Sequence, residues 1–264
     1  MGDGGERPLV VAGFQAAGSP GDVGANLALL RDAAAAARGR GADLLITPEM
    51  FLTGYNVGDA LPGLARHDLL GPVAEIARQH DLALVVGGPE TAPEGIYNAA
   101  FAFDATGALL GRHRKAHLFG DLDRALFRAG DRPFTAVDLR GVRVAVCICY
   151  EVEFPETVRA AALAGAHLMA VPTALMKPFR FIAEQVVRAR AWENQMYVAY
   201  VNHDGREGEL EYVGRSSIIG PDATVLDAVG HGDALLCADV DPATVVRARV
   251  ENPYLIDLRR DLFG

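Results

Sequence analysis

The chain has 264 residues, half of them hydrophobic, which is enough to bury a substantial core and argues against disorder. Its formal net charge of −9, without any block of Lys and Arg, argues against a nucleic-acid partner and against binding to an anionic membrane surface. The acidic opening MGDGGERP and the absence of an apolar run of roughly 18 residues predict a cytoplasmic protein without a membrane span.

Apolar runs of strand length recur along the chain. Most are continuous rather than alternating, as in strands that are covered on both faces. The predicted strands are Leu9–Ala16, Leu44–Thr47, Leu82–Gly87, Asn98–Phe103, Val142–Tyr150, Leu168–Pro172, Met196–Asn202, Ser216–Gly220 and Leu235–Val240. The predicted helices are Asn26–Arg38, Pro72–Gln79, Pro155–Ala164 and Phe181–Asn194. We therefore expect an α/β chain that forms one domain over residues 5–264.

The last segment, residues 252–264, is predicted to be a C-terminal tail. Leu255, Leu258 and Leu262 recur at helical spacing within the amphipathic stretch YLIDLRRDLF. Packing against its own subunit is the ordinary interpretation of such a stretch. Crossing to a partner subunit is the alternative.

Three residues with useful chemistry stand at or near the ends of predicted strands, where ligand sites of α/β sheets gather. Glu49 follows LLITP, Lys115 closes ALLGRHRK, and Cys149 lies near the end of VRVAVCIC. Each alone has an ordinary explanation, as a solvated carboxylate, a surface lysine or a small buried thiol. Together they would supply a general base, an electrostatic stabiliser and a nucleophile.

The sequence around these residues resembles the nitrilase, or carbon–nitrogen hydrolase, superfamily. The matching segments are TPEMFLTGY, HRKAHLFGD and CICYEVEFPE, and further similarity lies in GADLLITPE, RARAWENQMYVAYVN and GRSSIIGPD. The resemblance implies a four-layer α-β-β-α sandwich with two mixed sheets packed face to face, and a homodimer. It also implies that Cys149 is the nucleophile, Glu49 the general base and Lys115 the group that stabilises the tetrahedral intermediate, without a metal or an organic cofactor.

The pair Cys147 and Cys149 has other interpretations. Three cysteines do not make a disulfide framework in a reducing cytosol, and no histidine pair stands near this strand to complete a zinc site. Positions i and i+2 of a strand share one face, so periodicity does not separate the two thiols. The position of Cys149 nearer the strand end favours it, and Cys147 is expected to be packing. His113 or His117 as a catalytic base is the weaker alternative to Glu49.

The family usually has a second glutamate in the loop between the lysine and the cysteine, and this sequence departs from that pattern. The loop LFGDLDRALFRAGDRP contains no Glu, and Asp123 or Asp121 is the candidate for this supporting role. A further supporting group is the backbone N–H of Tyr150, which could meet the developing oxyanion beside Lys115. The remaining substrate contacts are expected at Tyr55, Asp121, Glu151, Thr173 and Ala174.

Within the superfamily, MFLTGYNVG, HLFGDLDR, EYVGRSSIIGPD and PYLIDLRRDLF most resemble 5-aminopentanamidase and related stereoselective amidases. The resemblance implies a small amide substrate with a remote amine or guanidine, such as 5-aminopentanamide or 4-guanidinobutanamide. By charge, the acidic residues that could bind this cation are Glu207, Glu209, Glu211 and Asp121. The alternatives are an N-carbamoyl amine or amino acid hydrolase, a nitrilase with the same three residues, and a catalytically silent scaffold of the same fold.

Overall fold

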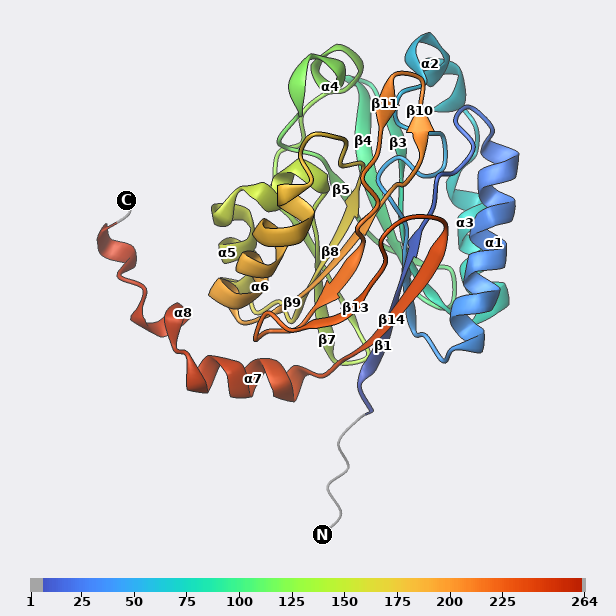
Figure 1. Cartoon of the computed structure of the whole chain (residues 1–264). Coiled ribbons are helices and arrows are strands. Elements are labelled where there is room, and N and C mark those ends of the chain that lie inside the picture. Colours follow the sequence, from blue (N-terminus) through green and yellow to red (C-terminus); the bar gives the residue numbers. More distant parts are fainter. Residues whose placement is uncertain (1–6, 263–264) are drawn as a thin grey trace.

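The protein is built of four layers, two of sheet enclosed by two of helix (Figure 1). The computed structural model describes residues 7–262, so the acidic opening residues 1–6 lie outside the described part. The first sheet has the strand order β14-β1-β2-β3-β4-β5. Its strands are β1 (Leu9–Gln15), β2 (Leu44–Ile46), β3 (Ala83–Ala92), β4 (Gly95–Phe103), β5 (Leu109–Arg114) and β14 (Ala234–Val240).

The second sheet repeats this arrangement with the order β13-β12-β9-β8-β7-β6. Its strands are β6 (Thr135–Leu139), β7 (Val142–Val146), β8 (Leu168–Thr173), β9 (Tyr197–Asn202), β12 (Ser217–Ile219) and β13 (Val225–Ala228). Each sheet has three parallel strands in the middle, β1-β2-β3 or β7-β8-β9, and antiparallel strands on either side. The prediction of two mixed sheets packed face to face is confirmed.

Helices cover the outer face of each sheet. The first sheet carries α1 (Val23–Gly39) and α3 (Leu70–His80), and the second carries α5 (Pro155–Leu163) and α6 (Val187–Asn194), which follows a π-helical segment, Ile182–Val186. The Asp22 carboxylate caps α1 by accepting from Ala25 N, and Pro155 opens α5, where a missing N–H costs nothing. The shorter elements are α2 (Leu61–Leu64), α4 (Gly120–Leu126), α7 (Pro242–Glu251), α8 (Tyr254–Asp257) and the ribbon β10 (Arg206–Glu207) with β11 (Leu210–Glu211).

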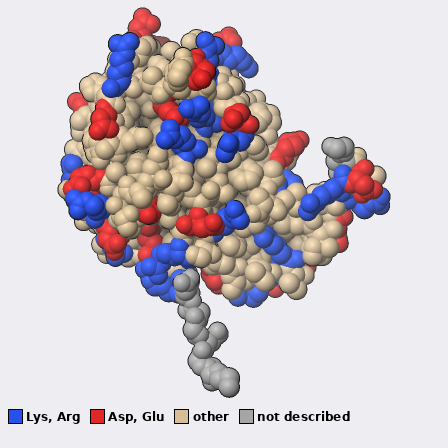
Figure 2. All heavy atoms as spheres, turned by 180° about the vertical axis from the view of Figure 1, so that it is seen from behind, with Lys and Arg blue, Asp and Glu red and all other residues tan. Residues whose placement is uncertain are grey.

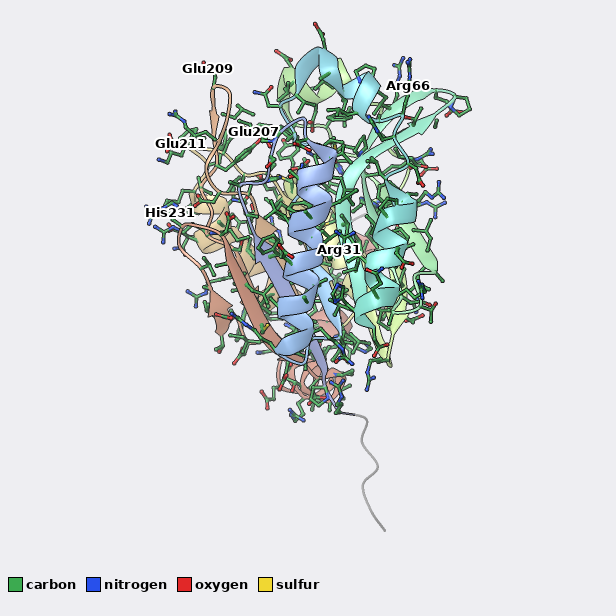
Figure 3. All side chains as sticks on the ribbon, turned by 90° about the vertical axis from the view of Figure 1, so that its right-hand side faces the viewer. Arg31, Arg66, Glu207, Glu209, Glu211 and His231 are labelled. Atoms are coloured by element: carbon green, nitrogen blue, oxygen red, sulfur yellow. The ribbon has the colours of Figure 1, made fainter. Side chains whose placement is uncertain are left out.

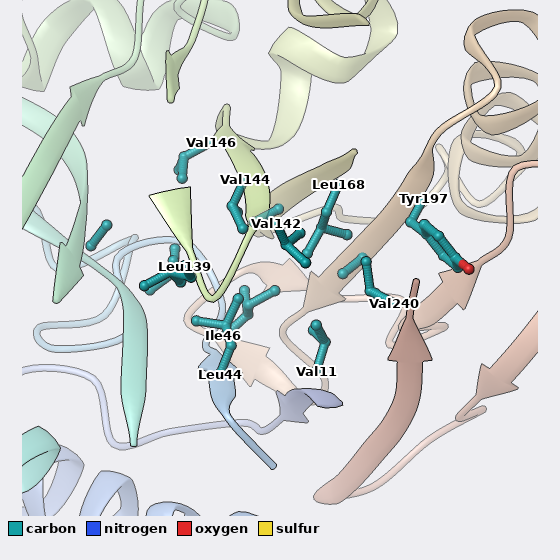
Figure 4. Packing of buried hydrophobic residues seen from close by; sticks show 14 of the residues in the cluster. Val11, Leu44, Ile46, Leu139, Val142, Val144, Val146, Leu168, Tyr197 and Val240 are labelled. Atoms are coloured by element: carbon teal, nitrogen blue, oxygen red, sulfur yellow. The ribbon is translucent and has the colours of Figure 1, made fainter. Parts of the chain in front are cut away.

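The main core lies between the two sheets. Val11, Leu44 and Ile46 of the first sheet pack there with Val144 and Leu168 of the second (Figure 4). Their neighbours along the strands point outward into the layers beneath the helices. Because both faces of each sheet are buried, the central strands appear in the sequence as continuous apolar runs.

Some strands and helices were not anticipated from the sequence. β5, β6 and β13 are partly exposed flanking strands whose apolar residues are interrupted by polar ones, so they lack the apolar run that identified the others. The short α4 and the helix α7 were also missed. The predicted strand Val142–Tyr150 ends early, at Val146, and a 3-10 turn over Cys149–Glu153 follows it.

The C-terminal tail contacts its own subunit through only part of its apolar face. Leu255 packs against the core beneath α6, and the Tyr254 ring lies edge-on to Trp192 with centroids 6.5 Å apart. Ile256 and Leu262 are exposed, and α8 covers only Tyr254–Asp257, so the helical spacing of the leucines does not continue to Leu262. Tail packing on its own subunit therefore involves one end of the stretch.

Charge is distributed without segregation on the face shown in Figure 2, where acidic and basic side chains alternate over a largely uncharged surface. Among the helices described between residues 7 and 262, none is long and apolar enough to cross a bilayer.

Candidate active site

A cavity of about 220 Å³ opens beside the turn that follows β7. It is smaller than the roughly 300–1,000 Å³ typical of sites for drug-sized ligands, so it suits a small substrate. The lining residues are Tyr55, Lys115, Phe119, Cys149, Tyr150, Glu153, Ala174, Leu175, Met176 and Phe179. The walls are mostly apolar, with Cys149, Lys115 and Glu153 as the groups that carry nucleophilic or ionic character.

Three side chains from distant segments form a buried ionic cluster next to Cys149. Lys115 Nζ lies 2.7 Å from Glu49 Oε1 and 2.8 Å from Asp123 Oδ2. None of the three side chains is more than 1% exposed. The ammonium is thus shared between two carboxylates, and buried charges of this kind persist only when they are paired.

The loops that carry Glu49 and Lys115 are held by backbone contacts. Lys115 follows β5, and its N–H donates to Asn98 O on β4 at 2.9 Å. The Asn98 side chain in turn donates to Glu49 Oε1 at 2.7 Å. The Glu49 loop also lies directly on β3 at Gly87, where a Cβ would be 2.6 Å from Met50 N and would collide with Pro48 O. A glycine is therefore required at position 87 for this close approach.

Asp123 occupies the position next to Lys115. The sequence left both Asp121 and Asp123 as candidates for this position. It lies on α4, is fully buried, and accepts from Tyr55 Oη at 2.7 Å and from Phe119 N at 2.8 Å. Asp121 lies on the same helix with a fully exposed side chain, 3.6 Å from Arg124. The expectation that Asp121 contacts substrate is therefore corrected, because it points to solvent and does not line the cavity.

Cys149 sits at the start of the 3-10 turn with a φ of +48°, a left-handed conformation that is uncommon for residues other than glycine. Because the strand has already ended, the two thiols do not share a face. Cys147 packs in the layer beneath α5 and α6, whereas Cys149 packs between the sheets and lines the cavity. The sharp turn, rather than strand periodicity, separates them.

Glu151 anchors this turn from behind. Its carboxylate accepts from Ile148 N and Ala116 N, each at 2.7 Å, and lies 2.7 Å from His113 Nε2. It is completely buried and does not line the cavity, so the predicted substrate contact at Glu151 is wrong. His113 is occupied by this contact, and His117 stacks on Phe154 with centroids 4.2 Å apart.

Burial and charge shift the proton affinities of the cluster. Burial raises the pKa of Glu49 above its usual value, Lys115 opposes this, and Asp123 adds to it. Burial alone would lower the pKa of Lys115, but Glu49 and Asp123 outweigh it and the net pKa is raised. Burial and the charge of Glu49 raise the pKa of Cys149, while Lys115 and the Ala174 N–H favour its thiolate. At neutral pH the lysine is charged and the cysteine is a thiol, so ionising the thiol requires a base.

Tyr55 and Ala174 line the cavity as expected, and Thr173 does not. The Thr173 hydroxyl is buried and donates to Val171 O at 2.9 Å, so the predicted contact is corrected. Ala174, the next residue, has its N–H close enough to Cys149 to favour the thiolate. Tyr150 contributes its ring to the wall, 5.2 Å from that of Phe119.

The acidic residues proposed for a substrate cation lie outside the cavity. Glu207 is buried, but its Oε2 accepts from Tyr55 N at 2.9 Å, Asn56 N at 2.7 Å and Tyr212 Oη at 3.0 Å. Glu209 is exposed at the tip of the ribbon and Glu211 pairs with Lys177 at 2.7 Å. Figure 3 shows Glu209 and Glu211 toward the outer edge and Glu207 nearer the interior. Glu207 instead holds the loop that carries Tyr55.

The cavity also contains residues that sequence reasoning missed. Glu153 is the clearest, since it ends the 3-10 turn that begins at Cys149 and contributes to the cavity wall. A 3-10 turn repeats every three residues, so the four-residue spacing from Cys149 did not place Glu153 on the same side in advance. Phe119, Phe179, Leu175 and Met176 come from loops without periodicity, and no local signal identifies them as wall residues.

Comparisons with known proteins show the family to which the chain belongs. The family model described as carbon-nitrogen hydrolase matches residues 10–250. A protein of Pseudomonas protegens described as a hydrolase in the pqqF 5′ region is 43% identical over 98% of this chain and 92% of its own length. An (R)-stereoselective amidase from a Pseudomonas species is 35% identical, over 95% and 91%.

Among solved structures, an amidase from a Nesterenkonia species superposes with a TM-score of 0.89 at 34% identity, over 97% of this chain and 95% of that one. A variant of that amidase carries the acetamide moiety of fluoroacetamide covalently on its active-site cysteine, and another is described in complex with butyramide. These similarities cover 97% of this chain.

Proposed function

The chain belongs to the carbon–nitrogen hydrolase family and is a hydrolase of linear amides, and from this premise we propose that Cys149 is its nucleophile. Glu49 acts as the general base and acid, and Lys115 stabilises the oxyanion together with the Tyr150 N–H. Asp123 holds Lys115 in position. One observation carries this assignment, namely the buried Glu49–Lys115–Asp123 cluster beside a thiol that lines the cavity.

The first half of the reaction forms a thioester. Glu49 takes the proton of the Cys149 thiol as Sγ attacks the amide carbon, and negative charge develops on the amide oxygen. Lys115 meets that charge, and a preorganised donor of this kind is typically worth about 100- to 1,000-fold in rate. Glu49 then returns the proton to the amide nitrogen, the C–N bond breaks, and ammonia leaves.

The second half releases the acid. Glu49 takes a proton from water as the water oxygen attacks the thioester carbon, and the tetrahedral intermediate again faces Lys115. The C–S bond breaks, Sγ recovers a proton from Glu49, and the carboxylic acid departs. Glu49 thus has to be ionised at the start of each half, and its Oε2, which has no hydrogen-bond partner among the described residues, is the oxygen free to accept the proton.

Intact-protein mass spectrometry tests the assignment. Wild-type protein mixed with butyramide and quenched in acid should carry an acyl group on Cys149, and Cys149→Ala should carry none and release no ammonia. Cys147→Ala serves as the matched control, because its thiol lies in a different layer and its loss should leave the adduct intact. An acyl group on Cys147 would refute the assignment.

We further propose that the physiological amide has a short aliphatic chain ending in an amine or guanidine, as in 5-aminopentanamide or 4-guanidinobutanamide. The apolar walls and the small cavity support a short chain, and the motif resemblance supports the remote cation. An N-carbamoyl amino acid would need basic groups for its carboxylate. The lining residues include one basic side chain, Lys115, which is already paired with two carboxylates.

Ammonia release across an amide panel tests this finer proposal. Pentanamide, butyramide, 5-aminopentanamide and 4-guanidinobutanamide should be compared by kcat/KM under the same conditions. The cationic amides should be preferred. Equal or better turnover of the uncharged amides would refute the remote cation while leaving the thioester chemistry in place, and conversion of a nitrile would indicate a nitrilase.

A further inference from the structure

Glu153 is an acidic side chain in the cavity to which the reaction assigns no role. It ends the 3-10 turn that begins at Cys149, is half-buried, and contributes to the cavity wall. Its backbone carbonyl accepts from Arg190 Nη2 at 2.6 Å, but within residues 7–262 no side-chain hydrogen bond or ion pair engages its carboxylate. A half-buried carboxylate without a partner is costly, and a ligand that pairs with it would offset that cost.

The other acidic groups near the cavity are already occupied. Glu49 and Asp123 share the Lys115 ammonium. Glu151 accepts two backbone N–H groups behind the turn, and Glu207 accepts two more beneath the Tyr55 loop. Arg190 is the cation that most lowers the pKa of Glu153, and it is also engaged elsewhere. It donates to the backbone carbonyls of Val152 and Glu153 and pairs with the Glu193 carboxylate at 2.9 Å.

Aromatic rings stand in the same wall. Phe119 and Tyr150 meet at 5.2 Å between centroids, and Phe119 and Phe179 meet at 5.6 Å, all three lining the cavity. Ring faces attract a desolvated cation through their negative quadrupole. A carboxylate among such rings has the composition of a site for an organic ammonium or guanidinium, and it is poorly suited to a carboxylate or a phosphate.

We propose that Glu153, with the rings of Phe119, Tyr150 and Phe179, binds the positively charged far end of the substrate and so selects cationic amides over uncharged ones of equal length. This inference rests on the proposed amidase function, because it takes the acyl carbon to be at Cys149. The carboxylate and the thiol are four residues apart on one turn and open into the same cavity, so one short chain spans both groups.

Burial raises the pKa of Glu153, against smaller opposing effects of Arg190 and Lys115. A bound ammonium favours the ionised carboxylate, so binding of a cationic amide at a pH near this raised pKa should be accompanied by proton release. The KM of the cationic amide should therefore rise as the pH falls through that range. The KM of the uncharged analogue should not depend on the ionisation of Glu153.

Glu153→Gln tests the inference, using 5-aminopentanamide and pentanamide, which differ only in the terminal amine. The ratio of their kcat/KM values should fall by roughly 10- to 100-fold, the effect of losing a hydrogen bond to a charged group. Pentanamide turnover by the same variant is the reference in that ratio, and a urea titration shows that the variant is folded. Glu156→Gln is the matched control, because Glu156 lies three residues further on, is exposed at the start of α5, and does not line the cavity.

A charge reversal provides the second test. Glu153→Lys should disfavour 5-aminopentanamide and improve kcat/KM for glutaramate, which carries a carboxylate at its far end. If wild-type protein prefers the cationic amide and Glu153→Gln keeps the same preference, the role of Glu153 is refuted and the proposed function stands. If wild-type protein forms no thioester with any amide, the proposed function itself fails.

Discussion

The Tyr55 hydroxyl donates a 2.7 Å hydrogen bond to Asp123 Oδ1, while Asp123 Oδ2 lies 2.8 Å from Lys115 Nζ. Tyr55 and Asp123 are 68 residues apart in the chain, and both are buried. An aspartate thus joins the lysine where the family usually has a glutamate. Because Tyr55 and Phe119 N hold its two oxygens, the shorter side chain is fixed in place beside the ammonium.

Asp123→Asn should lower kcat/KM for a short amide by about 100-fold, since a catalytic group displaced by about 1 Å loses that much. Tyr55→Phe removes one hydrogen bond from the same carboxylate and should cost less, roughly 10-fold. Steady-state ammonia release measures both. Asp121→Asn is the control on the same helix, because its side chain is exposed. An Asp123→Asn enzyme with wild-type activity would contradict the positioning role.

The pH dependence of activity follows from the raised pKa of Glu49. The base must be ionised, and burial raises its pKa from an ordinary 4.5, so kcat/KM should fall on acidification at a higher pH than for an exposed glutamate. Asp123 contributes to that increase. In Asp123→Asn the acid limb should therefore move to lower pH. An acid limb that stays at the same pH, or moves to higher pH, would show that a group other than Glu49 controls it.

Stability at high pH should reflect Lys115. Its pKa in the folded protein is raised, so its contribution to stability is complete below the ordinary lysine pKa of 10.5 and is lost as the pH rises through the higher folded value. Lys115→Met removes the ammonium proton that the folded protein holds more tightly than the unfolded chain does. Urea titrations at increasing alkaline pH should show a smaller decline for Lys115→Met than for wild-type protein. An identical decline would exclude Lys115 as its source.

Glu151→Gln should destabilise the turn that carries Cys149. The carboxylate accepts from Ile148 N and Ala116 N, and the NH₂ of a glutamine would face one of these donors. A buried donor without a partner costs about 1–3 kcal/mol, which a urea titration would measure, and kcat should fall with it. Glu156→Gln, exposed on the adjacent helix, should change neither quantity. Unchanged stability would argue against the anchoring role.

Gly87→Ala should displace the loop that carries Glu49. The added methyl would meet backbone atoms, Pro48 O and Met50 N, which cannot rotate away. Overpacking of this kind typically costs about 1–3 kcal/mol, and here the movement would fall on the base itself. Gly88→Ala is the adjacent control, since its methyl would meet the flexible side chain of Leu52 at 3.0 Å. Equal activity of the two variants would contradict this assignment.

The sequence by itself determined that this is an α/β chain with buried strands, and its resemblance to a known family implied the four layers and the site residues Glu49, Lys115 and Cys149. Strands covered on both faces must be apolar at every position, so the central strands were visible as continuous runs, whereas flanking strands such as β5 were not. Glu49, Lys115 and Cys149 were recognisable because each stands in a distinctive local motif. Those motifs are local residue patterns, and they do not indicate which distant side chains pack around Glu49, Lys115 and Cys149.

Only the tertiary structure decided the choices that depend on distant partners. Asp121 and Asp123 are two residues apart on a helix and so face nearly opposite directions, and the side that is buried is set by Tyr55 and Lys115. Glu207 looked like a free acidic group until its contact with Tyr55, 152 residues away, was visible. Cys149 is separated from Cys147 by a left-handed backbone angle, which the turn around Glu151 imposes and strand periodicity does not predict.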